Sequence, residues 1–176
     1  MVIYIKSILN YQITNYDCAP TTFVNAISYL FHREEIQPSI LRDIYKYTLD
    51  EKGTSDKAMI KLCRILNNRN YNLNCKVITN ITYEQINDCL LNGGVVILKC
   101  FQSSEHYVLI TKIDKRYVYL FDPYYINIKK INDKSIKIMN DSRYNRRVNV
   151  NRVFSNTKDD FAIGNNKLFI LIKKTD

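Results

Sequence analysis

The sequence predicts an α+β fold, with helices in the first half of the chain and an antiparallel sheet in the second. Two observations support this prediction. From Cys18 to Leu91, apolar residues recur at helical spacing in segments that capping and turn residues separate. After Gly93-Gly94 the pattern changes, because the segment 95–101 is nearly all apolar, which is typical of a central strand buried on both faces.

The predicted helices begin at recognisable start signals. Pro38-Ser39 opens one helix, Ser55 or Thr54 can cap the next, and the segment 82–85 (Thr-Tyr-Glu-Gln) is a capping box. With these starts, helices are expected over residues 18–33, 38–47, 56–67 and 82–91.

The predicted strands fill the rest of the chain. A tight turn at Asp114-Lys115-Arg116 joins two of them into a hairpin, and Ile136 and Ile138 mark a short edge strand within a polar segment. The other strands are expected over residues 72–78, 95–101, 106–113, 116–121, 126–131, 147–154 and 167–173. No repeat or linker divides the chain, so we expect a single domain over residues 1–176.

Composition narrows the class of protein. There is no run of eighteen apolar residues and no secretory signal in the segment 1–9, so neither a transmembrane helix nor export is expected. The odd number of cysteines, 5, indicates reduced thiols in a cytoplasmic protein. With no CxxC pair and 2 histidines, we expect no metal and no other cofactor.

The net charge of +9 raises the possibility of an anionic partner. Much of the excess lies between Lys129 and Arg152, where basic residues alternate with isoleucine and valine. This pattern is typical of strands with one solvated face, which disfavours nucleic-acid binding. An acidic protein or peptide partner explains the charge equally well.

The segment 11–22 delivers a cysteine to the start of a helix. Pro20 suits the first helical turn, Asp17 can cap it, and apolar residues follow at helical spacing from Phe23 to Phe31. Cys18 would therefore meet unpaired N–H groups at the positive end of the helix dipole, which favour the thiolate. The alternative is a buried thiol that packs as a small hydrophobe.

A cysteine nucleophile needs a base and a group that orients the base. His32 lies fourteen residues along the same helix from Cys18, about 21 Å by the helical rise, which leaves His106. A hairpin centred on Asp114 would place residue 122 opposite residue 106, so Asp122 could hold the imidazole. The alternatives are a surface histidine on a strand and an ordinary Asp-Pro turn.

Gln12 precedes the cysteine by six positions. Its side-chain amide and the backbone N–H of Cys18 would make a two-donor oxyanion hole. The alternative for Gln12 is a solvated loop amide.

These residues resemble a known family. Gln12-x5-Cys18 with Asp-Cys-Ala-Pro-Thr, the strand His-Tyr-Val-Leu-Ile at 106–110 and Leu-Phe-Asp-Pro at 120–123 are similar to the C39-like, bacteriocin-processing type of papain-like cysteine peptidases. The resemblance implies a papain-like fold in which a nucleophile helix packs on a C-terminal antiparallel sheet. It implies that Cys18 attacks, His106 is the base, Asp122 orients it, and Gln12 helps to bind the oxyanion.

The chain departs from the family at Ala19, where glycine is usual. Transporter-borne members of the family cut after a double glycine in peptide leaders, but the sequence shows no transporter segments, so that substrate is not implied. We therefore expect a cysteine-dependent peptidase or amide hydrolase that acts on a peptide or protein, including acidic ones. The alternatives are an acyltransferase or transamidase, and a basic binding module with an idle thiol.

Overall fold

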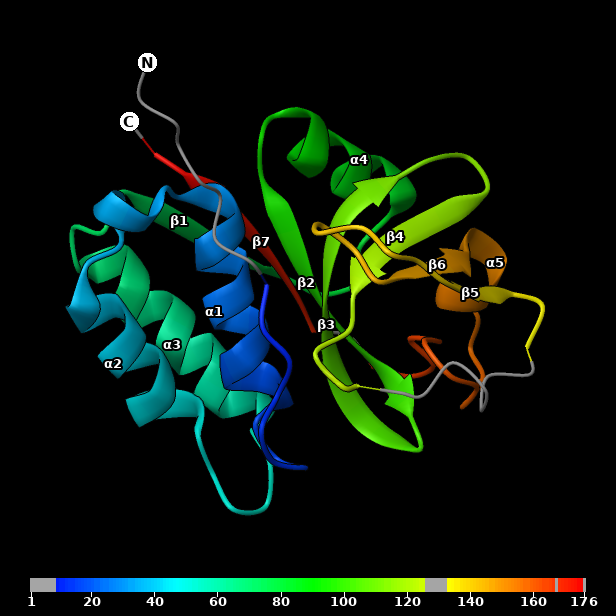
Figure 1. Ribbon diagram of the computed structural model, residues 1–176, viewed down its shortest axis with the longest axis horizontal. Coiled ribbons are helices and arrows are strands. Elements are labelled where there is room, and N and C mark those ends of the chain that lie inside the picture. The colour runs from blue at the N-terminus through cyan, green and yellow to red at the C-terminus, as the bar shows by residue number, and fades with distance from the viewer. Residues whose placement is uncertain (1–8, 126–132, 167, 176) are drawn as a thin grey trace.

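The computed structural model describes residues 9–125, 133–166 and 168–175. The helical half comes first in the chain, and the sheet follows it (Figure 1). The helices are α1 (Cys18–Leu30), the 3-10 turn η1 (Arg33–Glu35), α2 (Pro38–Thr48), α3 (Asp56–Asn68), α4 (Tyr83–Leu91) and α5 (Val150–Val153). The strands are β1 (Leu73–Ile78), β2 (Val95–Gln102), β3 (Ser104–Ile113), β4 (Tyr117–Phe121), β5 (Ile136–Ile138), β6 (Arg146–Asn149) and β7 (Phe169–Lys174).

The strands form one antiparallel sheet in the order β1-β7-β2-β3-β4-β6-β5. Helices α1, α2 and α3 pack beside the β1–β3 part of this sheet, while β4, β6 and β5 extend away from them (Figure 1). Strand β2 is the centre of the packing, because Val95 and Ile97 contact the cluster built on α1–α3, whereas Val96 and Leu98 contact the cluster that includes α4. The prediction that this strand is buried on both faces is confirmed.

The helix starts follow the expected signals. Ser55 accepts a hydrogen bond from the N–H of Ala58, and Thr82 and Gln85 form the reciprocal capping box. Pro38 occupies the first turn of α2. The first helix is shorter than expected, because α1 ends at Leu30 and the chain then makes the separate turn η1.

The strand expected over 147–154 is partly wrong. Only β6 is a strand, and the chain turns into α5 at Val150. Asn149 causes the change, because its side chain accepts a hydrogen bond from the N–H of Asn151 and caps the short helix. Val153 is buried, but it belongs to this helix and not to a strand. The strand expected over 126–131 lies outside the described residues.

The β3–β4 hairpin differs from the expected register by two residues. Leu109 pairs with Phe121 and Ile110 with Leu120, and a bulge follows at Thr111. The turn runs from Asp114 to Tyr117, because the Asp114 carboxylate accepts hydrogen bonds from two backbone N–H groups there. A shift of two residues leaves a side chain on the same face of a sheet. The expected pairing of residues 106 and 122 is therefore wrong in register, but it places both residues on the correct face.

None of the helices in the described part of the chain combines the length and the apolar character that a membrane crossing requires.

Candidate active site

Cys18 is the first residue of α1, at the end of a loop that Asp17 closes. The Asp17 carboxylate accepts hydrogen bonds from the N–H groups of Ile13 (3.0 Å) and Thr14 (2.8 Å) and from the Thr14 hydroxyl. Burial alone would raise the pKa of Asp17, but these donors lower it below its usual value. Asp17 holds the N-cap position, but its side chain accepts no hydrogen bond from a backbone N–H of α1 and meets the helix only through the Thr21 hydroxyl (3.5 Å), so it orders the loop rather than capping α1 as expected.

The start of α1 is anchored to the sheet and to the preceding segment. The Thr22 hydroxyl donates to the backbone oxygen of Tyr107 in β3 (3.0 Å), next to His106. One turn later, the Asn25 side chain bonds both the N–H and the C=O of Asn10. These buried contacts fix the nucleophile helix against the strand that carries the histidine.

His106 joins the two other proposed members of the site. Its Nε2 lies 2.8 Å from Oδ1 of Asp122, and the ring is 6% exposed. Burial alone would lower the pKa of His106, but hydrogen bonds with Asp122 and with Cys18 raise it to about 9. Because Nε2 is bound to Asp122, the ring nitrogen that remains for Cys18 is Nδ1.

Asp122 follows β4 and is fully buried. Its Oδ2 accepts a hydrogen bond from the Gln102 side chain (3.0 Å) and lies 3.5 Å from the Arg146 guanidinium. Its Oδ1, which faces His106, also accepts a hydrogen bond from the N–H of Tyr124. A carboxylate that accepts hydrogen bonds from several neighbours is held in one orientation.

The backbone of Asp122 is clamped by Asn145. The Asn145 Oδ1 accepts from the N–H of Asp122 and its Nδ2 donates to the C=O of the same residue, both at 2.8 Å. Nδ2 also lies 3.4 Å from the Tyr11 hydroxyl, beside Gln12 in sequence. The clamp therefore links the aspartate to the segment that precedes the nucleophile.

Sequence reasoning missed the residues that support Asp122. Gln102 lies just outside the strand expected over 95–101, but it ends β2 and pairs with Ser104 across a one-residue turn at Ser103. Arg146 was assigned with other basic residues to a solvated face, but it is 3% exposed. No local pattern marks Arg146 or Asn145, because only the pairing of β6 with β4 brings them to Asp122.

Gln12 lies next to the end of β4, since its backbone N–H donates to the carbonyl of Pro123 (2.8 Å). Its side-chain Nε2 donates to the backbone oxygen of Thr14 (2.7 Å), and its Oε1 is buried without a partner among the described residues. One N–H of the amide is thus committed to the loop, and its second N–H is the one that could serve an oxyanion.

Cys18 opens into a groove of about 510 Å³. The loop before α1, the α2–α3 loop and the start of β3 line this groove through Asn15, Tyr16, Cys18, Lys52, Gly53, Thr54, Ser55, Ser104, Glu105 and Tyr107. Lys99 braces the wall that Glu105 contributes, because it is paired with Glu105 (2.7 Å) and with Asp56 at the start of α3 (2.8 Å). Polar and apolar atoms both line the groove.

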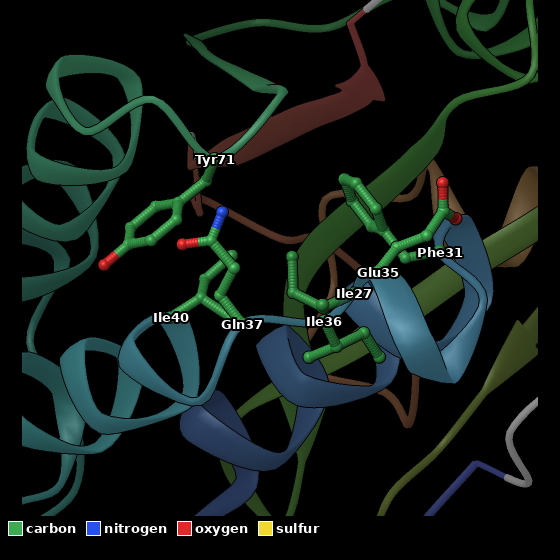
Figure 2. A pocket seen from close by; sticks show the side chains of 7 residues that line it. All are labelled: Ile27, Phe31, Glu35, Ile36, Gln37, Ile40 and Tyr71. Carbon is green, nitrogen blue, oxygen red and sulfur yellow. The ribbon is translucent and has the colours of Figure 1, made fainter.

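The other cysteines and a second cleft offer no comparable site. Cys63, Cys75, Cys89 and Cys100 are at most 4% exposed, against 9% for Cys18. Burial, followed by the charge of Asp122, raises the pKa of Cys100. Figure 2 shows an apolar cleft between α1 and α2, but its volume of about 10 Å³ holds no more than a water molecule.

The family model described as the Peptidase_C39 like family matches residues 4–151 of this chain. The chain belongs to that family. It is a cysteine peptidase-like hydrolase with a papain-like α+β fold, as expected from the motif around Cys18.

A solved structure shares this fold. The crystal structure of a double glycine motif protease from an AMS/PCAT transporter, in complex with the leader peptide, is similar over 97% of this chain and 94% of the other, with a TM-score of 0.51 and 15% identity. A search of the curated proteins finds no match.

Proposed function

We propose that the chain cleaves amide bonds in a peptide or protein through Cys18, His106 and Asp122. The observation that carries the proposal is the position of His106, whose Nε2 lies 2.8 Å from Oδ1 of Asp122 and whose pKa is raised by both Asp122 and Cys18. An aspartate that holds one nitrogen leaves the other free to exchange a proton with the sulfur.

In this mechanism the Cys18 thiolate attacks the carbonyl carbon of the scissile bond, and the carbonyl oxygen becomes an oxyanion. As the tetrahedral intermediate collapses, the C–N bond breaks and protonated His106 gives its proton to the leaving amine. The product is a thioester on Cys18. His106, now neutral, takes a proton from water, which attacks the thioester and releases the acid and the thiol.

The oxyanion would lie at the N-terminus of α1. The N–H of Cys18 is one donor there, and the second N–H of the Gln12 amide is the other that we propose. The bond between Gln12 and Thr14 supports this role, since it fixes the amide beside the nucleophile loop. An amine in place of water would give acyl transfer with the same first half-reaction.

The substrate class follows from the groove and from the similar fold. The double glycine motif protease was crystallised with a leader peptide, which supports a peptide substrate for this chain. The open groove at Cys18, with its mixed polar and apolar lining, can receive a peptide segment. We also propose a cytoplasmic location, because five free thiols suit a reducing compartment.

Alkylation tests the nucleophile. Iodoacetamide at neutral pH should modify Cys18 at least about tenfold faster than any other cysteine, because thiolate character and access both favour it. Peptide mapping by mass spectrometry identifies the modified residue. Cys18→Ala should abolish peptide cleavage with the fold retained, and Cys89→Ala, at a buried thiol distant from the groove, serves as the matched control.

Equal labelling rates at all five cysteines would contradict the proposal. Such a result would favour the alternative of a binding module whose thiol is idle.

A further inference from the structure

Three basic side chains lie in one row on the same face of strands β3, β4, β6 and β5. Lys112 pairs with Tyr119, Tyr119 with Arg147, and Arg147 with Lys137. Paired residues of neighbouring strands project on the same face of a sheet, so these side chains lie side by side across four strands. At about 4.8 Å per strand, the row is about 14 Å long. We call Lys112, Arg147 and Lys137 the basic row.

The basic row has no acidic partner within the described ranges. None of its three cations forms an ion pair there. Two of them rest on tyrosines instead: Lys112 Nζ lies 4.7 Å from the ring centroid of Tyr119, and the Arg147 guanidinium 4.3 Å from that of Tyr117. Ring contacts of this kind hold the cations in place, and the charge of Lys112 also acts on Asp114, whose pKa it helps to lower.

The carboxylates near the basic row are occupied. Asp114 accepts from the Tyr119 hydroxyl (2.9 Å) and from two N–H groups of its own turn. Asp141 is paired with Arg143. Neither satisfies the charge of Arg147 or Lys137.

A hollow of about 200 Å³ lies at the Lys112 end of the row. It is lined by two cations, Lys112 and Arg143, and by three residues with hydroxyl groups, Tyr29, Thr111 and Tyr144. No carboxylate among the described residues lines it, although Arg143 is paired with Asp141. A concave site made of ammonium, guanidinium and hydroxyl groups is suited to an oxyanion such as a carboxylate.

We propose that the basic row and this hollow form a docking surface for an acidic segment of the peptide substrate, with one carboxylate in the hollow and the next ones along the row. The inference rests on the proposed function, because the anionic groups that a peptide substrate presents are the side-chain carboxylates of glutamate and aspartate. Glutamates at alternate positions of an extended segment are about 7 Å apart, so two or three of them span the row.

The tyrosines distinguish this ligand from a nucleic acid. Single-stranded nucleic acids bind basic surfaces through bases that stack on open aromatic faces. Here Lys112 and Arg147 cover faces of Tyr119 and Tyr117, and Tyr144 packs edge-on against Tyr119 with centroids 5.0 Å apart. The surface therefore offers charge without a free stacking platform.

Fluorescence anisotropy of a labelled peptide of alternating glutamate and glycine tests the surface. The intact protein should bind this peptide at low salt. Lys112→Gln/Lys137→Gln should weaken binding about fivefold or more, since two charge contacts are lost. The matched control is Lys57→Gln/Lys76→Gln on α3 and β1, which removes the same two charges from exposed positions and should stay within about twofold.

If both double variants weakened peptide binding equally, the proposal would be overturned, because binding would then depend on the net charge of the protein and not on the basic row. Absence of binding by the intact protein would also overturn it. Tighter binding of a twelve-residue oligothymidylate, lost in Lys112→Gln/Lys137→Gln, would make the face a nucleic-acid surface instead. The assay needs no turnover and can be run with Cys18→Ala, so its outcome is independent of the alkylation test.

Discussion

His106 is a buried imidazole whose protonated form is stabilised by its neighbours. Burial opposes the charge, and the hydrogen bonds with Asp122 and Cys18 outweigh that opposition. A histidine in this state can donate a proton, which is the role that the proposed mechanism gives to His106.

The raised pKa makes a prediction about stability. A histidine whose pKa rises from about 6.5 to about 9 on folding stabilises the folded state fully below pH 6.5, and the contribution disappears as the pH rises through about 9. The free energy of unfolding should therefore fall between pH 6.5 and 9.5, by on the order of 3 kcal/mol at most. Urea titrations at several pH values measure it.

Asp122→Asn is the control for this pH dependence. Without the carboxylate the pKa of His106 loses the partner that raises it most, so the slope over the same range should flatten. An unchanged slope in this variant would contradict the assignment to His106.

At the scale of elements, the site depends on how the end of β4 is held. Pairing of β4 with β6 ends at Leu120 and Arg146, so Asp122 has no strand partner on that side. Asn145 replaces the missing ladder with two side-chain bonds from the residue just before β6. The sheet thus positions the aspartate at a place where regular pairing has stopped.

Asn145→Ala should destabilise the fold by about 2–4 kcal/mol, because it leaves a buried N–H and a buried C=O of Asp122 unsatisfied. Chemical denaturation measures the change. Asn92→Ala removes an exposed asparagine that bonds only within its own helix end, and it should cost less than about 0.5 kcal/mol. Similar losses in the two variants would contradict the clamp.

At the scale of the whole molecule, the last strand of the chain lies inside the sheet, between the first strand and the central one. β7, close to the C-terminus, lies between β1 and β2, and it contributes Ile170 and Ile172 to the cluster that α1–α3 share. The helical part and the sheet therefore have no separate cores.

We predict from this topology that residues 1–176 unfold as a single domain. Far-UV circular dichroism and tyrosine fluorescence should give the same midpoint in urea, and the chain contains 14 tyrosines and no tryptophan. Two separated transitions would instead indicate that the helices and the sheet are independent units.

The sequence by itself determined the parts of this protein that depend on local patterns. The capped helices, the apolar central strand and the motif around Cys18 are readable because capping, periodicity and turn chemistry act over a few residues. The α+β fold and the family followed from these.

Only the tertiary structure decided what surrounds the candidate triad. The Asp122 contacts with Gln102, Arg146 and Asn145 depend on the pairing of strands that are distant in sequence, and the β3–β4 hairpin lies two residues away from the expected register. The same pairing aligned the basic row across four strands and buried Arg146 among residues that look alike in sequence. Long-range register is set by packing and bulges over the whole sheet, and no short stretch of sequence contains it.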